Sequence, residues 1–197
     1  MKKNEEDVEK LSNGQLGYVH IPSMSDSPYR NTYEEMMGKY HDKKGVIVDT
    51  RFNGGGDLVS DLAMFFTGQK FINYGNDRRM LGYEPSFRWT KPTIGMFNEA
   101  NYSDGSCFAC GYKELNIGKT VGMPNPGTCS WAGWESLPDG NTRWGMVPVS
   151  SKDKNGQWME NLETIPDFVV KNDPLVISNG HDQQLEKAVE ELLKMVK

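Results

Sequence analysis

The chain has 197 residues, enough for one large domain with a substantial core. It carries 27 acidic and 22 basic residues, a net charge of -5, and the basic residues are scattered, which argues against nucleic acid as a partner. No apolar run approaches the roughly 18 residues of a membrane span, so none is expected.

Both ends of the chain differ in composition from the middle. Residues 1–12 are charged and lack the apolar core of a signal peptide. We expect residues 1–13 to form a solvated lead-in, or to mark the point at which a longer chain was cut, and residues 14–197 to form one domain. Apolar residues recur at helical spacing over 182–197, which predicts a C-terminal helix that docks on this domain.

Strands and helices alternate between these ends. Apolar β-branched runs predict strands, and apolar residues at helical spacing predict helices. The expected strands are 16–21, 45–50, 93–98, 119–122, 145–149 and 167–170, and the expected helices are 29–40, 58–67 and 103–115. Successive strand–helix pairs imply βαβ units, so we expect an α/β fold with a mostly parallel sheet and flanking helices.

The segment 123–145 interrupts this alternation. It carries Trp131, Trp134 and Trp144 among prolines and glycines, which is typical of an ordered loop or hairpin rather than of a linker. The three indoles either pack over an edge of the sheet or form one wall of a substrate cleft.

Three consecutive glycines, at 54–56, follow the strand 45–50. Only glycine adopts a positive φ without steric cost, and it lets another segment approach the backbone closely. Amide groups in such a turn can bind a phosphate or the oxyanion of an acyl-transfer intermediate. Asp57 and Leu58 come next and complete neither a phosphate loop nor a dinucleotide fingerprint. An oxyanion site and a purely structural turn remain as the two interpretations.

Ser103 occupies a similar position after the strand 93–98, at the first turn of the next expected helix. Ligands of open parallel α/β sheets bind at this edge of the sheet. Ser103 is therefore a candidate nucleophile, with the amide of Asp104 as an oxyanion donor in the positive field of the helix N-terminus. The alternative is that the Ser103 hydroxyl caps the helix.

Two of the three cysteines, Cys107 and Cys110, form a C-x-x-C pattern on the same expected helix. A zinc site needs about four ligands, and only Cys129 and three scattered histidines could complete one. We therefore predict no metal site. We expect Cys107 and Cys110 to be buried core thiols with a raised pKa and slow alkylation.

These segments together resemble the catalytic core of a known family. Residues 49–56 match the D-x-R-x-N-x-G-G segment of the tricorn-type and carboxy-terminal processing serine peptidases (peptidase family S41), and residues 98–105 resemble the tricorn nucleophile segment. Residues 17–22 resemble the strand that follows the family's PDZ-like module, and residues 158–167 the tricorn segment with a catalytic glutamate. The resemblance spans roughly residues 14–197 and implies a crotonase-like, ClpP-like core.

The resemblance implies a role for each matching residue. Ser103 would be the nucleophile, and Glu160 the acid that organises the charge relay. The amides of Asp104 and of either Gly55 or Gly56 would form the oxyanion hole. Apolar neighbours of Glu160 predict partial desolvation, which would raise its pKa unless a hydrogen-bond donor compensates. Three polar residues would brace the glycine turn by hydrogen bonds: Asp49, Arg51 and Asn53.

A serine nucleophile needs a general base within hydrogen-bond reach. The carboxy-terminal processing branch uses a downstream lysine, but this chain has Thr128 in that region, whereas the tricorn-type branch uses a histidine upstream of its PDZ-like module. His20, His41 and His181 are poor substitutes, because they lie in an apolar strand, in a charged turn and beside the final helix. We expect the catalytic histidine to lie outside this chain, and the isolated chain to fold but to be inactive.

The resemblance implies a peptidase that cleaves a peptide or unfolded-protein substrate by acyl transfer, without a metal or organic cofactor. One alternative is a degenerate peptidase that binds peptides without cleaving them. Another is a crotonase-like acyl-CoA enzyme that stabilises a thioester enolate. The resemblance allows a homo-oligomer of the full-length protein, and it slightly favours export to the periplasm over the cytoplasm.

Overall fold

Five parallel strands form the central sheet of the protein in a computed structural model, which describes residues 2–196. In spatial order the strands are β1 (Leu16–His20), β2 (Gly45–Asp49), β5 (Thr93–Phe97), β6 (Lys119–Gly122) and β9 (Phe168–Val169). The predicted α/β fold with a mostly parallel sheet is confirmed. The strand expected at 145–149 belongs to a separate hairpin.

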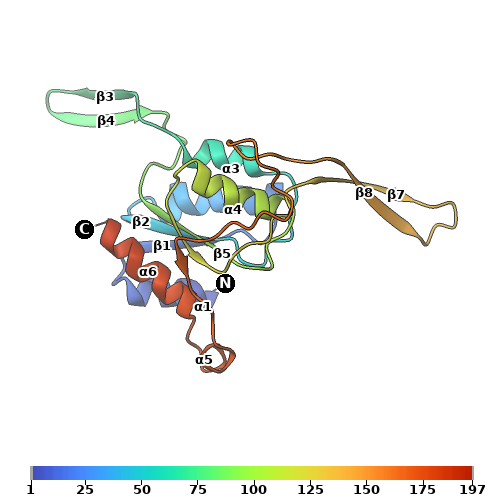
Figure 1. The fold of residues 1–197 in the computed structure, drawn as a ribbon. Coiled ribbons are helices and arrows are strands. Elements are labelled where there is room, and N and C mark those ends of the chain that lie inside the picture. The colour runs from blue at the N-terminus through green and yellow to red at the C-terminus, as the bar shows by residue number, and fades with distance from the viewer. Residues whose placement is uncertain (1, 197) are drawn as a thin grey trace.

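Helices cover both faces of this sheet (Figure 1), so the central strands are buried on both sides. Val46 and Val48 of β2 belong to one hydrophobic cluster, and Ile47 between them belongs to the other. The first cluster packs under α2 (Asp26–Glu34), the π-helical turn η1 (Glu35–Lys39), α3 (Val59–Phe66) and α4 (Asp104–Glu114), and the second under α1 (Lys2–Leu11) and α6 (Gln183–Met195). The expected C-terminal docking helix is α6. No helix in the described part of the chain is long and apolar enough to cross a membrane.

The charged N-terminal segment is a helix rather than the expected solvated lead-in. α1 packs against β1 and α6, and its Val8 is only 1% exposed. An ion pair between Glu5 and Lys39 links it to η1. The segment contains few apolar residues, so its narrow contact with the core gave little helical signal. Met1 and Lys197, the ends of the two expected terminal segments, lie outside the described residues.

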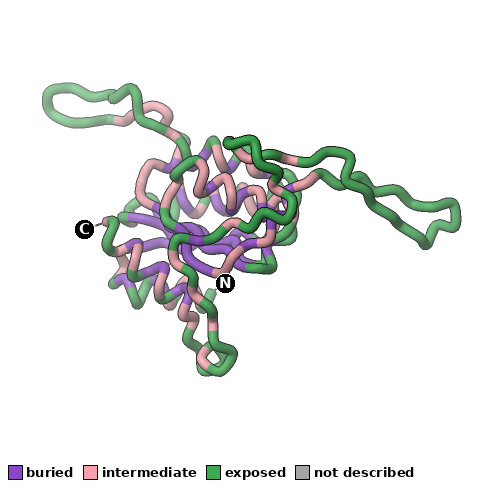
Figure 2. Tube along the Cα trace, viewed as in Figure 1, coloured by how far each residue is buried: buried purple, intermediate pink, exposed green. Residues whose placement is uncertain are grey.

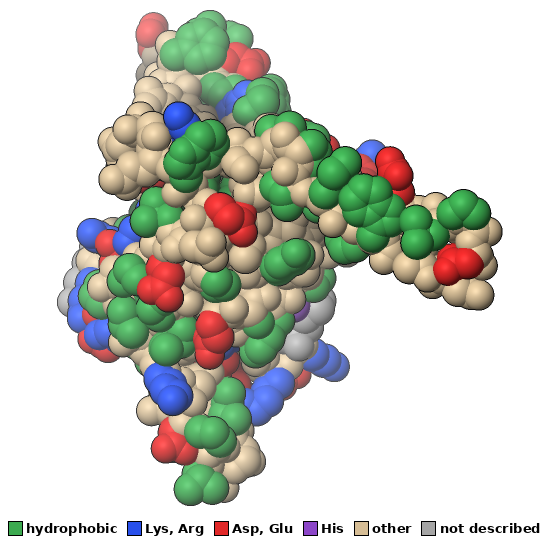
Figure 3. Space-filling model, turned by 45° about the vertical axis from the view of Figure 1, so that its right-hand side comes forward, with side chains coloured by type: hydrophobic (Ala, Val, Ile, Leu, Met, Phe, Trp, Pro, Cys, Tyr) green, Lys and Arg blue, Asp and Glu red, His purple; other side chains and the backbone are tan. Residues whose placement is uncertain are grey.

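Two antiparallel hairpins project from the domain as arms (Figure 1). One arm pairs β3 (Ile72–Asn76) with β4 (Arg79–Glu84), and the other pairs β7 (Trp131–Ser136) with β8 (Arg143–Val149). Figure 2 shows both arms as largely exposed, and Figure 3 shows hydrophobic side chains on projecting parts of the surface. Trp131, Trp134 and Trp144 are 64%, 57% and 39% exposed on the second arm. The expectation that these indoles pack over a sheet edge is therefore wrong. The first arm and the short helix α5 (Pro174–Ser178) were not predicted.

A buried ion cluster attaches α6 to the end of β2. The Arg51 guanidinium donates to the Asp49 carboxylate at 2.7 Å and to Asp182, the N-cap residue of α6, at 3.0 Å. It also donates to Gln184 at 2.9 Å. Burial opposes ionisation of Asp182, but the hydrogen bond and charge of Arg51 outweigh it and lower the pKa of this carboxyl. Arg51 therefore ties the functional edge of the sheet to the C-terminal helix.

Acid should weaken this attachment. Because the pKa of Asp182 is lowered in the folded state, its contribution to stability is present above the usual Asp pKa of about 4 and is lost as the pH falls through the lower folded value. Asp182→Asn should lower the free energy of unfolding near neutral pH and flatten its pH dependence below about pH 4. Urea denaturation over this pH range measures both effects. Asp42→Asn changes a carboxylate that is 87% exposed and should alter neither, so equal effects of the two substitutions would contradict this role.

Candidate active site

The glycine turn after β2 and the turn before α4 lie against each other at the carboxyl edge of the sheet. Gly55 has a φ of +94°, and a β-carbon there would lie 2.6 Å from Ser103 Cβ and 3.2 Å from the amide nitrogen of Asp104. Both the backbone conformation and this close approach require glycine. The two segments face each other as the sequence predicted.

Ser103 lies on a strained turn. Its φ of +52° and ψ of -126° fall in a region that residues with a side chain rarely occupy. Ser103 is the N-cap residue of α4, but its hydroxyl makes no capping hydrogen bond, so the capping interpretation is wrong. A strained serine between a strand and a helix, with a hydroxyl that the fold does not use, is typical of a nucleophile.

Two amide groups beside Ser103 are available to a ligand. Within residues 2–196, the N–H groups of Gly56 and Asp104 donate to no protein acceptor. The Gly55 N–H, in contrast, donates to Asn53 Oδ1 at 2.8 Å. Of the two glycines named from the sequence, only Gly56 keeps an amide without an acceptor in the described chain.

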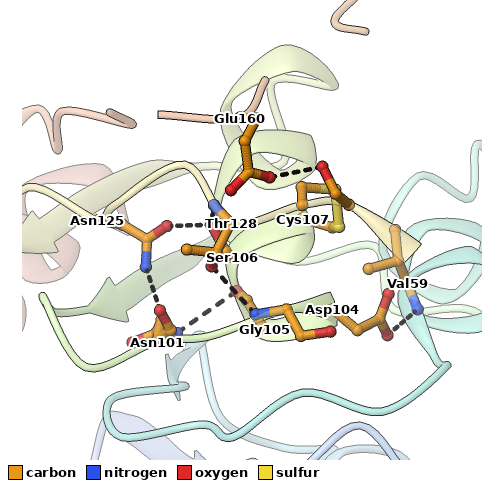
Figure 4. Close-up of a disulfide and its surroundings, with 12 residues drawn as sticks. Val59, Asn101, Asp104, Gly105, Ser106, Cys107, Asn125, Thr128 and Glu160 are labelled. Carbon is orange, nitrogen blue, oxygen red and sulfur yellow. Dashed lines mark hydrogen bonds between the residues drawn. A yellow bond between two sulfur atoms is a disulfide. The ribbon is translucent and has the colours of Figure 1, made fainter. Parts of the chain in front are cut away.

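The Asp104 side chain also ties the two turns together (Figure 4). Its carboxylate accepts the N–H groups of Leu58 at 2.6 Å and Val59 at 3.2 Å, at the N-terminus of α3. Burial raises the pKa of Asp104, although these two donors oppose the shift. Asp104, whose amide has no acceptor in the described chain, therefore also fixes the helix that follows the glycine turn.

Four asparagines, each at most 5% exposed, hold the turns in place: Asn53, Asn98, Asn101 and Asn125. The side-chain amide of Asn53 donates to the backbone carbonyl of Ile21 at 2.8 Å. The backbone carbonyl of Asn53 accepts the N–H of Tyr102 at 2.9 Å. Asn125 donates to the Asn101 carbonyl at 3.3 Å. A buried network whose donors and acceptors are paired fixes one geometry. Only Asn53 was predicted in such a role.

The loop after β6 contacts both Ser103 and Glu160, which lies further along the chain, after β8. Thr128 Oγ1 accepts the amide N–H of Ser103 at 3.1 Å, and two residues later the Ser130 hydroxyl donates to Glu160 Oε2 at 2.5 Å. Figure 4 shows Glu160 close to the first turn of α4. The Glu160 side chain is exposed, so the expected partial desolvation is wrong. A carboxylate that is held by one donor and open to solvent can accept a further hydrogen bond.

No hydrogen bond joins a histidine to Ser103 within residues 2–196. His41 and His181 are exposed, and their rings contact neighbouring carboxylates at 3.1 and 3.0 Å. His20 lines a cavity of about 600 Å³ that Ser103 does not line, and its Nδ1 is buried without a hydrogen-bond partner in the described chain. The described chain therefore offers Ser103 no histidine base.

Cys107 forms a disulfide with Cys129, 22 residues away, with Cα atoms 5.0 Å apart. The prediction that Cys107 is a free core thiol is therefore wrong. The first turn of α4 presents Cys107 to the loop after β6, a contact that the C-x-x-C spacing did not indicate. Cys110 stays free and half-buried, and burial raises the pKa of its thiol as predicted.

The described residues contain no cluster of three or more His, Cys, Asp or Glu side chains that could hold a metal ion.

The fold and the site define an α/β domain in which a serine on a strained turn faces a glycine turn. Residues 15–170 match the family model described as peptidase family S41, and the chain belongs to this family. It is 32% identical to the tricorn protease of Thermoplasma volcanium over an alignment of 203 positions. It is 31% identical to the tricorn protease homolog of Saccharolobus solfataricus over an alignment of 207 positions. These matches cover 98% and 100% of this chain but only 19% and 18% of the relatives.

Solved structures show the same fold. The crystal structure of the tricorn protease superposes with a TM-score of 0.86 at 24% identity, over 98% of this chain and 19% of that one. The photosystem II D1 C-terminal processing protease superposes with a TM-score of 0.62 at 18% identity, over 90% of this chain and 46% of that one. The chain thus spans about a fifth of the length of the curated tricorn relatives that it matches.

Removing the Asn53 side chain should loosen the two turns. Asn53→Ala leaves the Ile21 carbonyl and the Gly55 amide without partners, and should lower the free energy of unfolding by roughly 2 to 3 kcal/mol. Urea denaturation measures the loss. Asn73→Ala, on the exposed strand β3, should cost less than about 0.5 kcal/mol. Similar losses for the two variants would contradict the role of Asn53.

Proposed function

We propose that this chain is the nucleophile domain of a serine peptidase that hydrolyses peptide bonds by acyl transfer. The observation that carries the proposal is the contact between Gly55 and Ser103. This contact sets the turn that carries Ser103, whose hydroxyl caps no helix, against the glycine turn, and the amides of Gly56 and Asp104 in these two turns have no protein acceptor in the described chain. Acyl transfer needs a nucleophile and oxyanion donors about 3 Å from the developing charge.

Each residue of this set has one task in the reaction. A base takes the Ser103 hydroxyl proton as Oγ attacks the carbonyl carbon of the peptide bond, and the carbonyl oxygen becomes an oxyanion that accepts hydrogen bonds from Gly56 and Asp104. The base returns the proton to the leaving amine as the C–N bond breaks, which leaves an acyl ester on Ser103. Water then gives a proton to the same base as its oxygen attacks the ester carbon, and the base returns that proton to Ser103 Oγ as the ester C–O bond breaks and the carboxylic acid product leaves.

The base in this proposal comes from a part of the protein outside residues 2–196. Two observations support this origin: no histidine is bonded to Ser103, and Thr128 contacts the Ser103 amide where the carboxy-terminal processing branch would need a lysine. Glu160 is the positioning residue for that external base. Its exposed carboxylate, held by Ser130, can accept a hydrogen bond from an incoming imidazole.

Hydrolysis by the full-length protein should depend on Ser103. Ser103→Ala should lower kcat on a mixed peptide library by about 10⁴-fold or more and abolish labelling by a fluorophosphonate. Ser136→Ala, on the exposed arm, should change neither readout. Labelling of Ser103 without hydrolysis would favour a peptide-binding module instead. An unlabelled protein that is retained on immobilised CoA would favour an acyl-CoA enzyme.

The 197-residue chain by itself tests where the base comes from. It should fold, because both hydrophobic clusters lie within it, and it should hydrolyse peptides at least about 10³-fold more slowly than the full-length protein. Circular dichroism and the same peptide assay measure both properties. A rate near that of the full-length protein would contradict an external base and make His20 a candidate again.

Glu160 should affect turnover far more than folding. In the full-length protein, Glu160→Gln keeps the size of the side chain but removes the charge that would position the base, and should lower kcat roughly 100-fold or more. Its melting temperature should stay within about 2 °C of the wild type. Glu163→Gln, at an exposed residue three positions away, is the control for both measurements. Unchanged kcat with a large loss of stability would make Glu160 a purely structural residue.

We also propose that the protein acts outside the cytoplasm. Disulfides persist in oxidising compartments and are rare in the cytosol, and the bridge between Cys107 and Cys129 supports an exported location. Fractionation of the native cells should recover the full-length protein in an exported fraction, with this bridge oxidised by mass spectrometry. Recovery from the cytoplasm with both thiols reduced would contradict the proposal.

A further inference from the structure

The disulfide between Cys107 and Cys129 lies close to Thr128 and Glu160 (Figure 4). Cys107 is in the first turn of α4, and its amide donates to the Ser103 carbonyl at 3.1 Å. Cys129 lies in the loop after β6. The threonine before it accepts the Ser103 N–H at 3.1 Å, and the serine after it donates to Glu160 at 2.5 Å. The bridge thus joins the two segments that hold Ser103 and Glu160.

Hydrogen bonds to the domain hold the backbone of this loop only as far as Thr128. Asn125 exchanges backbone hydrogen bonds with Thr164 at 3.0 and 2.9 Å, and the Thr128 N–H donates to Ser106 Oγ at 3.3 Å. Neither backbone group of Cys129 takes part in a hydrogen bond within residues 2–196. At this position the side chain of Cys129, which is only 6% exposed and is cross-linked to Cys107, therefore holds the chain to the domain.

The chain beyond Cys129 cannot supply that restraint. It enters the arm formed by β7 and β8, whose residues are all exposed. An arm without burial against the domain lacks the packing that would restrain its motion, and any such motion acts on the segment at its base. Without the bridge, this motion would reach Thr128, whose hydroxyl contacts the Ser103 amide, and Ser130, which holds Glu160.

We propose that the disulfide between Cys107 and Cys129 is a positioning element of the active site, so that full peptidase activity requires the oxidised bridge. This inference rests on the peptidase function proposed above. A dithiol reductant transfers two electrons and two protons to the bridge, which becomes two thiols, while the reductant becomes a disulfide. The parallel sheet and the buried asparagines keep their hydrogen bonds, whereas the segment that holds Glu160 gains freedom.

Reduction should therefore lower kcat about 10- to 100-fold, because small displacements of reacting groups have effects of this size. KM should change by less than about twofold, since binding groups away from the reacting bond are unaffected. Cys110 provides a matched control, because it lies three residues from Cys107 on the same helix and is free. Cys110→Ala should keep both the activity and its sensitivity to dithiothreitol.

The experiment measures kcat and KM of the full-length protein before reduction by dithiothreitol, after it, and after re-oxidation. Far-UV circular dichroism is recorded in each state. We expect kcat to fall on reduction and to recover on re-oxidation while the spectrum stays constant. The double variant Cys107→Ala/Cys129→Ala should match the reduced wild type in both conditions. If this variant does not fold, the reversible reduction of the wild type decides alone.

Two results would overturn the inference. One is an equal kcat in both states, with reduction of the bridge verified by mass spectrometry. The other is a loss of activity that only parallels a loss of the far-UV signal, which would make the bridge a purely structural element. Hydrolysis that survives Ser103→Ala would instead overturn the proposed peptidase function, so the two failures are distinguishable.

Discussion

The candidate site depends on one steric constraint, the approach of the glycine turn to the turn that carries Ser103. A single β-carbon at Gly55 would collide with Ser103, so the two turns can touch only because this residue has none. The parallel sheet makes the contact possible, because β2 and β5 are neighbours and their carboxyl ends meet at one edge. The Asp104 carboxylate and the buried asparagines then hold the turns at this distance.

The strained backbone of Ser103 persists because hydrogen bonds hold the residues on both sides of it. A positive φ at a residue with a side chain costs about 1 to 3 kcal/mol. The backbone on both sides of Ser103 is fixed by buried partners: the Tyr102 N–H bonds to the Asn53 carbonyl, and the Ser103 carbonyl accepts from the first turn of α4. The fold thus uses the neighbours of Ser103 for stability and leaves its hydroxyl without a capping hydrogen bond. A hydroxyl that capped α4 would be committed to the helix instead.

The sequence predicted the parts that follow from local pattern, and missed those that depend on distant contacts. β-branched runs that end at glycine or serine turns were enough to predict β2, β5 and the edge where the turns meet. The pairing of Cys107 with Cys129 was missed, because it depends on how the loop after β6 crosses α4. The role of Asn125 was missed for the same reason: one polar residue in a proline-rich loop gives no sign that it will be buried. The first hairpin arm follows no burial pattern, and the helix α1 shows only a narrow one, so neither could be predicted from periodicity. The second arm lies where the prolines and glycines of segment 123–145 indicated a loop or hairpin.

The central claim is that the glycine turn and the turn before α4 form one oxyanion site beside Ser103. A crystal structure of the full-length protein after reaction with a fluorophosphonate tests it most directly, because the phosphonyl oxygen stands in for the oxyanion of the tetrahedral intermediate. We predict a covalent adduct on Ser103 Oγ, with that oxygen about 2.7 to 3.1 Å from the amide nitrogens of Gly56 and Asp104. An adduct on another residue, or an oxygen on Ser103 that points away from both amides, would contradict the claim.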